Sequence, residues 1–154
     1  MTKTEKTQVI EQLVEKLNAN NKIYLADCSS LTVEKVNAFR EINDFAHSHN
    51  VKMGIQLAHA GRKASTMLPW DDHRIATVEE GGWQAVSSSA IAFEGYLEPR
   101  ALTVDEIHQL TQEFVDAAVR SVKIGFDVIE LHAAHGYLFH QFYSPLANKR
   151  TDEY

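Results

Sequence analysis

Several features that would define a protein class are absent from this sequence of 154 residues. It has one cysteine, Cys28, which excludes an intrachain disulfide. No apolar run approaches the roughly 18 residues of a membrane-spanning helix, and residues 1–17 are charged throughout, unlike a secretory signal. Basic residues are not in excess, because the formal net charge is -6, which argues against a general nucleic-acid binder. We therefore expect a cytoplasmic protein with no membrane segment and no nucleic-acid partner.

The chain instead contains alternating helical and strand patterns, and 44% of its residues are hydrophobic. The patterns predict helices over 2–17, 32–49, 103–124 and 137–143, strands over 23–26, 51–57 and 126–131, and a long loop over 61–102. Val128, Ile129 and Leu131 make the last strand apolar on both faces, so we expect it to be buried on both. Buried strands that alternate with helices indicate a parallel α/β sheet.

Residues that can donate hydrogen bonds or protons follow the last predicted strand, in the string Glu-Leu-His-Ala-Ala-His-Gly-Tyr-Leu. His132 and His135 stand three residues apart in a strand-to-helix turn, so both rings can point N–H donors at one oxygen. Tyr137 can supply a proton from its phenol. Two alternatives stay open: a metal site that also uses His59, or histidines with unrelated roles.

A second cluster follows the strand predicted over 51–57. Gln56 offers both a donor and an acceptor, so it can bind an imide edge such as that of a flavin ring. The alternative is that Gln56 has only a structural role. Arg62 and Lys63 are interpreted as solvated loop charges. Both clusters come after the C-terminal ends of strands, which is where α/β proteins bind ligands.

Four strings carry a resemblance to a known family. They are GIQLAHAGRK (Gly54–Lys63), SSAIAF (Ser88–Phe93), FDVIELHAAHGYL (Phe126–Leu138) and FYSPLANKRTDEY (Phe142–Tyr154). Their order and separation resemble the Old Yellow Enzyme family, especially its bacterial NADPH dehydrogenase branch, over residues 39–154. The resemblance implies part of a (β/α)₈ TIM barrel that belongs to an FMN-dependent NAD(P)H:flavin oxidoreductase.

The resemblance also implies roles for the residues above. Such enzymes pass hydride from FMN to the C=C bond of an α,β-unsaturated carbonyl compound, so the expected partner is a small enone, enal or quinone-like molecule. Gln56 and His132 are expected to contact the flavin. His132 and His135 are expected to bind the substrate oxygen, and Tyr137 to donate the proton. No metal is expected.

The sequence also departs from the family pattern. The first barrel strand, with its Pro-x-Cys or Pro-x-Thr stretch, is not present, and the Gly-Gly expected after Tyr154 is not reached. A barrel of this type typically needs about 250 residues, and residues 39–154 supply 116 (154 − 39 + 1). We therefore expect a barrel piece that is inactive alone, holds FMN poorly, and associates or aggregates through open strand edges.

The beginning of the chain has a different likeness. Residues 2–40 resemble the N-terminus of the bacterial large-subunit ribosomal stalk-base protein, which predicts a helix-strand leader over residues 1–38 followed by the flavin oxidoreductase segment over 39–154. This division suggests a fusion. It also provides the alternative function, a ribosome- or rRNA-associated module that acts through residues 2–40.

Overall fold

The computed structural model describes residues 33–68, 70 and 74–154. The predicted helix over 2–17, the strand over 23–26 and Cys28 lie outside these residues. The expected division between residues 38 and 39 falls inside a helix and stays a prediction. The chain separates into two compact units, one made of Met1–Gln56 with Asp116–Glu130 and the other of Leu57–Val115 with Leu131–Tyr154.

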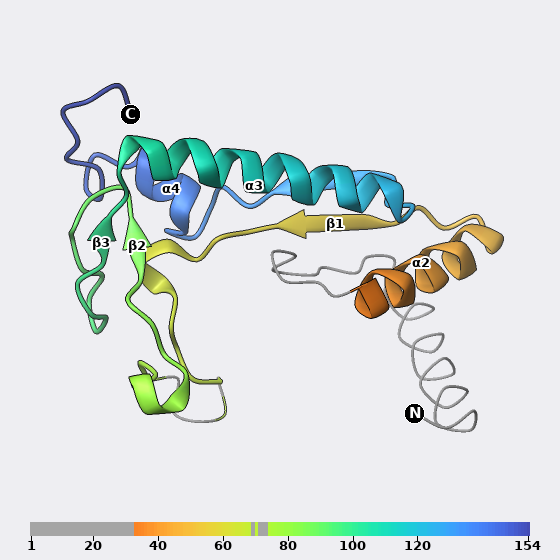
Figure 1. The fold of residues 1–154 in the computed structure, drawn as a ribbon, viewed down its shortest axis with the longest axis horizontal. Helices are drawn as coiled ribbons and strands as arrows, with labels where there is room; N and C mark the ends of the chain where they lie inside the picture. Colours follow the sequence, from red (N-terminus) through yellow and green to blue (C-terminus); the bar gives the residue numbers. More distant parts are fainter. Residues whose placement is uncertain (1–32, 69, 71–73) are drawn as a thin grey trace. The chain divides into compact units, whose positions relative to one another are not determined.

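Helices and short strands both occur along the described residues, as Figure 1 shows. The elements are α2 (Val33–Ser48), β1 (Gly54–Leu57), the short 3-10 helices η1 (Gly61–Lys63) and η2 (Val78–Glu80), β2 (Val86–Ser87), β3 (Arg100–Ala101), α3 (Val104–Lys123), β4 (Val128–Leu131) and α4 (Leu138–Tyr143). Strands β1 and β4 form one two-stranded sheet, and β2 and β3 form another.

Both sheets are parallel. The carbonyl of Met53 accepts the N–H of Val128 at 3.2 Å, and the carbonyl of Leu57 accepts the N–H of His132 at 2.9 Å. Residue numbers therefore rise together along β1 and β4, and each strand is followed by its own loop at the same edge of the sheet. The parallel pairing of β1 and β4, with α3 in the connection between them, confirms the predicted α/β class.

Hydrogen bonds between Thr103 and Glu106 fix the start of α3. The N–H of Thr103 donates to Glu106 Oε2 at 2.8 Å, and the N–H of Glu106 donates back to Thr103 Oγ1 at 3.2 Å, which is a capping box. The guanidinium of Arg100 donates two hydrogen bonds of 2.7 Å to the same carboxylate. These bonds, the one to Arg100 first, lower the pKa of Glu106 to about 2. The helix begins where the sequence predicts.

Apolar side chains form a small core in each unit. In the first unit the buried apolar residues are Ala46, Met53, Ile55, Ala117, Ile124 and Phe126. In the second, Leu102, Ile107 and Leu138 are buried, and Val86, Leu110 and Phe142 pack against them. The second core lies beside the turn that carries the candidate histidines, because Leu138 begins α4 directly after it.

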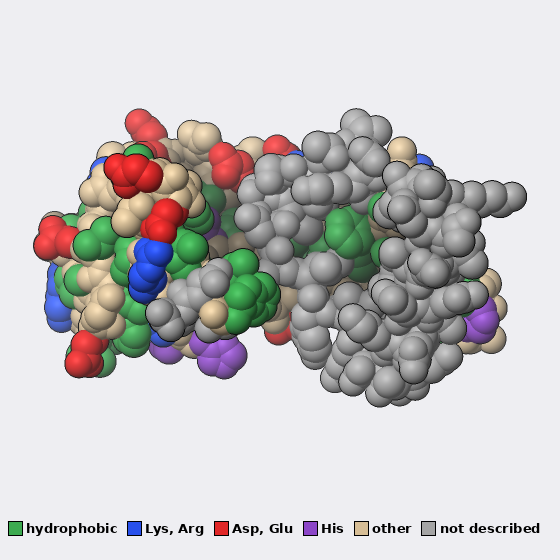
Figure 2. Space-filling view, turned by 90° about the horizontal axis from the view of Figure 1, so that it is seen from below, with side chains coloured by type: hydrophobic (Ala, Val, Ile, Leu, Met, Phe, Trp, Pro, Cys, Tyr) green, Lys and Arg blue, Asp and Glu red, His purple; other side chains and the backbone are tan. Residues whose placement is uncertain are grey.

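One expectation about the strands is wrong. Strand β4 is not buried on both faces, since Val128 is 58% and Leu131 52% exposed. Within the described residues β4 pairs with β1 alone, so its other edge is open. Large apolar side chains also reach the surface elsewhere, and hydrophobic groups are visible among the charged ones in Figure 2.

The segment over 61–102 is more ordered than a single loop. It contains η1, η2 and the parallel pair of β2 and β3, in which Val86 faces Arg100 and Ser87 faces Ala101. Strands of two residues are too short to show a period in the sequence. In the described part of the chain, no helix is long and apolar enough to cross a membrane.

Asp127 ties together the elements of the first unit. Its carboxylate accepts bonds from Lys52 Nζ at 2.7 Å, from the N–H of Met53 at 3.0 Å and from His47 Nε2 at 2.7 Å. Led by the bond to Lys52, these contacts hold the pKa of this carboxyl well below its ordinary value. The folded state therefore favours the charged carboxylate.

We predict that Asp127→Asn lowers the urea midpoint of unfolding at pH 7. Because the folded pKa of Asp127 is depressed, its contribution is complete above the unfolded pKa of about 4 and is lost as the pH falls through and below that value. The difference between wild type and Asp127→Asn should therefore shrink between pH 6 and pH 3. Asp44→Asn is the control, since Asp44 is exposed on α2. A difference that is constant with pH would contradict the assignment.

Candidate active site

Three of the predicted site residues come together in the turn between β4 and α4. The rings of His132 and His135 meet edge to face with centroids 5.1 Å apart, and His132 Nε2 lies 3.4 Å from His135 Nδ1. The ring of Tyr137 lies 4.7 Å from that of His132, centroid to centroid. The structure therefore brings the rings of these three residues together.

The turn fixes which nitrogen of His132 carries the proton. The N–H of Ala134 donates to His132 Nδ1 at 3.2 Å, so in the neutral ring the proton sits on Nε2. Nε2 is the atom that faces His135. His132 thus presents an N–H donor toward His135 Nδ1. An oxygen placed beside both nitrogens at the usual distance of about 2.9 Å could accept from His132 Nε2, and also from His135 Nδ1 when that nitrogen carries the proton of its ring.

The backbone of this turn is left-handed at two successive residues. His135 has φ of 56° and Gly136 has φ of 71°. The N–H of Gly136 donates to His140 Nδ1 at 2.9 Å, and the N–H of Tyr137 donates to the carbonyl of Ala134 at 3.1 Å. A left-handed histidine costs about 1–2 kcal/mol relative to ordinary backbone, so surrounding contacts must hold it there.

Gln141 is the buried side chain that connects this turn to the rest of the second unit. It is 1% exposed. Its Nε2 donates to the carbonyls of Gly136 at 2.7 Å and Ala60 at 3.2 Å. Its Oε1 accepts from Ser87 Oγ at 2.9 Å and from the N–H of Arg62 at 3.3 Å. The loops after β1 and β4 and strand β2 therefore meet at one amide.

Sequence reasoning missed Gln141. The available signal was its spacing, because it stands three residues after the buried Leu138 and so lies on the buried face of α4. A glutamine on such a face needs hydrogen-bond partners that only the folded chain reveals.

Arg62 and Lys63 are not the solvated loop charges that the sequence suggested. Lys63 Nζ donates to the carbonyl of His135 at 2.8 Å and lies 4.1 Å from the centroid of the Phe93 ring. Arg62 donates to the carbonyl of Ile91 at 3.1 Å. Both cations belong to η1, directly after β1, and Lys63 reaches the histidine turn.

Gln56 occupies a different place. It lies on β1 between the buried residues Ile55 and Leu57, so its side chain points to the opposite, half-buried face. Its amide makes no hydrogen bond within residues 33–68, 70 and 74–154. Its donor and acceptor therefore have no partner among the described residues, and they are the two kinds of group that an imide edge pairs with. Gln56 belongs to the first unit and the histidine turn to the second.

The metal alternative gains no support. Among the residues that the structure describes, no group of three or more histidine, cysteine or carboxylate side chains could hold a metal ion. His59 is engaged locally, because its Nδ1 accepts the N–H of Gly61 at 3.0 Å.

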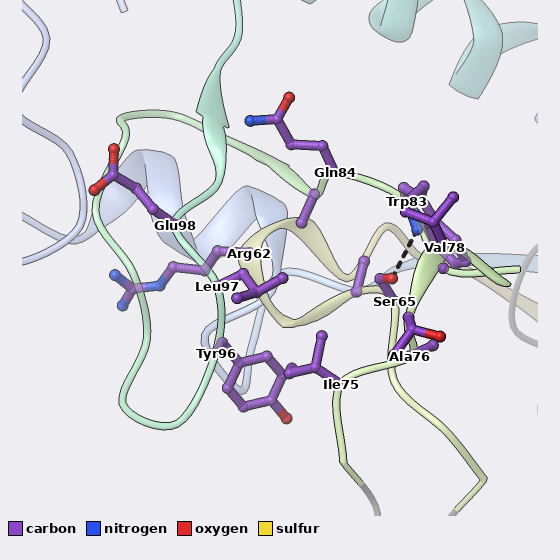
Figure 3. Close-up of a pocket in the computed structure, with 14 residues that line it drawn as sticks. Arg62, Ser65, Ile75, Ala76, Val78, Trp83, Gln84, Tyr96, Leu97 and Glu98 are labelled. Carbon is purple, nitrogen blue, oxygen red and sulfur yellow. Dashed lines mark hydrogen bonds between the residues drawn. The ribbon is translucent and has the colours of Figure 1, made fainter. Parts of the chain in front are cut away.

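A separate cavity of about 370 Å³ lies within the second unit, shown in Figure 3. Its walls include Ile75, Tyr96 and Leu97, and Ser65 Oγ accepts the N–H of Trp83 at 2.9 Å at its side. Neither the paired histidines nor the phenol beside them lines it. The cavity is therefore distinct from the candidate site.

Parallel strands with donors clustered past their C-terminal ends are the arrangement by which α/β proteins bind ligands. The chain matches the model of the NADH:flavin oxidoreductase / NADH oxidase family over residues 4–154 and belongs to that family. It is 50% identical over 125 residues to an NADH:flavin oxidoreductase of Gibberella zeae, which covers 78% of this chain and 30% of the relative. It is 47% identical over 122 residues to an NADPH dehydrogenase of Listeria welshimeri, covering 79% and 32%.

A solved structure of morphinone reductase in complex with tetrahydroNAD is also similar. The TM-score is 0.65 at 30% identity, and the match covers 80% of this chain and 36% of that one. These findings confirm the resemblance to the Old Yellow Enzyme family and the partial TIM barrel. The chain spans about a third of the length of the curated relatives it matches.

We predict that Gly61→Ala destabilises the chain by about 3 kcal/mol, the sum of left-handed strain and overpacking. Gly61 has φ of 60°, and an added Cβ would lie 2.2 Å from Gln141 Oε1, which is pinned by its own hydrogen bonds. The matched control is Gly81→Ala, where φ is 85° but no atom lies within 4 Å of the added Cβ. It should cost only about 1 kcal/mol. Equal losses in urea unfolding would show that Gln141 is not held rigidly.

Proposed function

We propose that this chain carries the substrate-binding turn of an FMN-dependent NAD(P)H oxidoreductase that reduces the C=C bond of α,β-unsaturated carbonyl compounds. The observation that carries the proposal is the convergence of His132 and His135, with 3.4 Å between the two facing nitrogens. The family match supports flavin and nicotinamide as the redox partners.

The two imidazoles act as the oxygen site. Hydrogen bonds from His132 Nε2 and His135 Nδ1 to the carbonyl oxygen draw electrons out of the conjugated C=C bond. When hydride adds to the β-carbon, the C=C electrons move toward this oxygen and form an enolate. The same two donors then stabilise the enolate oxygen, so they are worth more in the transition state than in the ground state.

When bound, FMN supplies the hydride, which it takes from NAD(P)H. Gln56 is the residue of this chain assigned to the flavin ring, through its half-buried amide on β1. Tyr137 stands beside His132 and is assigned the proton for the α-carbon, which completes the addition of H⁻ and H⁺ across the double bond. Solvent then returns a proton to the phenol.

We predict that His132→Ala and His135→Ala each weaken the binding of 4-nitrophenol about tenfold in the presence of FMN. A phenolate oxygen imitates the enolate oxygen, and loss of one hydrogen bond to a charged group costs about 1.5 kcal/mol or more. Binding is followed by the absorbance change of the nitrophenolate. His49→Ala is the control, since His49 lies next to the end of α2 and belongs to the first unit, whereas the turn belongs to the second.

Tyr137→Phe separates hydrogen bonding from ring packing. It keeps the ring beside His132 but removes the phenol, so 4-nitrophenol affinity should stay within about twofold of wild type, an effect smaller than one hydrogen bond. If neither histidine variant alters the affinity, the oxygen site is not where we place it.

A further inference from the structure

We propose that Lys63 is a positioning residue that holds the turn of His135 and Gly136 in its left-handed form, and through it sets the spacing of the histidine pair. This inference rests on the function proposed above. Lys63 does not contact the oxygen site in this assignment. It acts through the backbone carbonyl of His135, to which Nζ donates at 2.8 Å.

The turn requires such a support. His135 adopts φ of 56°, which only a few residue types tolerate, and it is followed directly by Gly136 at φ of 71°. Two successive left-handed residues aim the carbonyl of His135 away from the ordinary hydrogen bonds of a helix start. An ammonium donor is a strong partner for this carbonyl, because charge-assisted bonds contribute more than neutral ones.

Lys63 is itself fixed from the opposite side. Its Nζ lies 4.1 Å from the centroid of the Phe93 ring, and the guanidinium carbon of Arg62 lies 5.5 Å from the same centroid. A cation held over an aromatic face loses little further freedom when it also binds a carbonyl. The ammonium of Lys63 thus contacts both the Phe93 ring and the carbonyl of His135.

Gly136 shows that the turn is shaped around this lysine. A Cβ added at Gly136 would lie 3.1 Å from Lys63 Nζ and 3.3 Å from its Cε. The glycine therefore serves two needs, since it accepts the positive φ and leaves room for the lysine to pass. If Lys63 were lost, the close contact between its side chain and the turn at Gly136 would be lost with it.

The consequence reaches the site through one residue. The backbone at His135 determines where its Nδ1 lies relative to His132 Nε2. If the turn relaxes, the two nitrogens separate and no longer donate to one oxygen. The N–H of Tyr137, which closes the turn by donating to the carbonyl of Ala134 at 3.1 Å, should open more often as well.

The test uses Lys63→Met and Lys63→Arg in the full chain. Methionine keeps the apolar stem and removes the donors, whereas arginine keeps the charge and the donors. The control is Lys149→Met, because Lys149 Nζ also donates to a backbone carbonyl, that of Pro145, but away from the histidine turn. Two quantities are measured for each variant: hydrogen exchange of the Tyr137 amide by NMR, and 4-nitrophenol affinity in the presence of FMN.

We expect Lys63→Met to speed exchange at Tyr137 about tenfold, as loss of one charge-assisted bond implies, and to weaken 4-nitrophenol binding several-fold. Lys63→Arg should restore most of both, and Lys149→Met should change neither. Unchanged exchange at Tyr137 in Lys63→Met overturns the inference. So does unchanged affinity in Lys63→Met when His132→Ala weakens binding, which leaves the proposed function intact. If exchange rises but His132→Ala has no effect on affinity, the turn is supported as inferred and the oxygen site is the part that fails.

Discussion

The side-chain amide of Gln141 is the interaction on which the second unit depends. All of its hydrogen-bonding groups are used inside the protein, and its four partners come from three separate segments. A buried amide satisfied in this way contributes to stability only when every partner is in place, and leaving them unpaired would cost several kcal/mol. The amide therefore fixes the loops after β1 and β4 relative to β2 within one unit. Apolar contacts alone would allow these loops to slide.

This constraint explains why a site can exist in so small a structure. The histidine turn is bounded by three kinds of contact: the amide of Gln141 on the carbonyl of Gly136, the ammonium of Lys63 on the carbonyl of His135, and His140 Nδ1 accepting the N–H of Gly136. Each acts on the backbone, and none of the three involves the facing ring nitrogens of His132 and His135, which lie 3.4 Å apart. Gln141, Lys63 and His140 thus hold the backbone in place, whereas His132 and His135 supply the hydrogen-bond donors. Donors held in place in this way are typical of preorganised oxyanion sites.

The sequence predicted the features that arise from local patterns. The helical pattern over 103–124 located α3, and the histidines after an apolar strand located the turn. It did not predict features that depend on distant partners. Gln141 and Lys63 looked ordinary because their partners lie many residues away, and β4 looked buried because an apolar strand carries no information about which neighbours cover it. The two-residue strands β2 and β3 have no period to detect.

The left-handed backbone at His135 restricts which amino acids could replace it over evolutionary time. The position asks for a side chain that tolerates positive φ and also offers an N–H donor. Asparagine, aspartate and histidine enter this region most readily apart from glycine, and an ionised aspartate has no donor. Only histidine and asparagine satisfy both demands, so the interchange of these two residues is the substitution that this architecture can accept without rebuilding its turn.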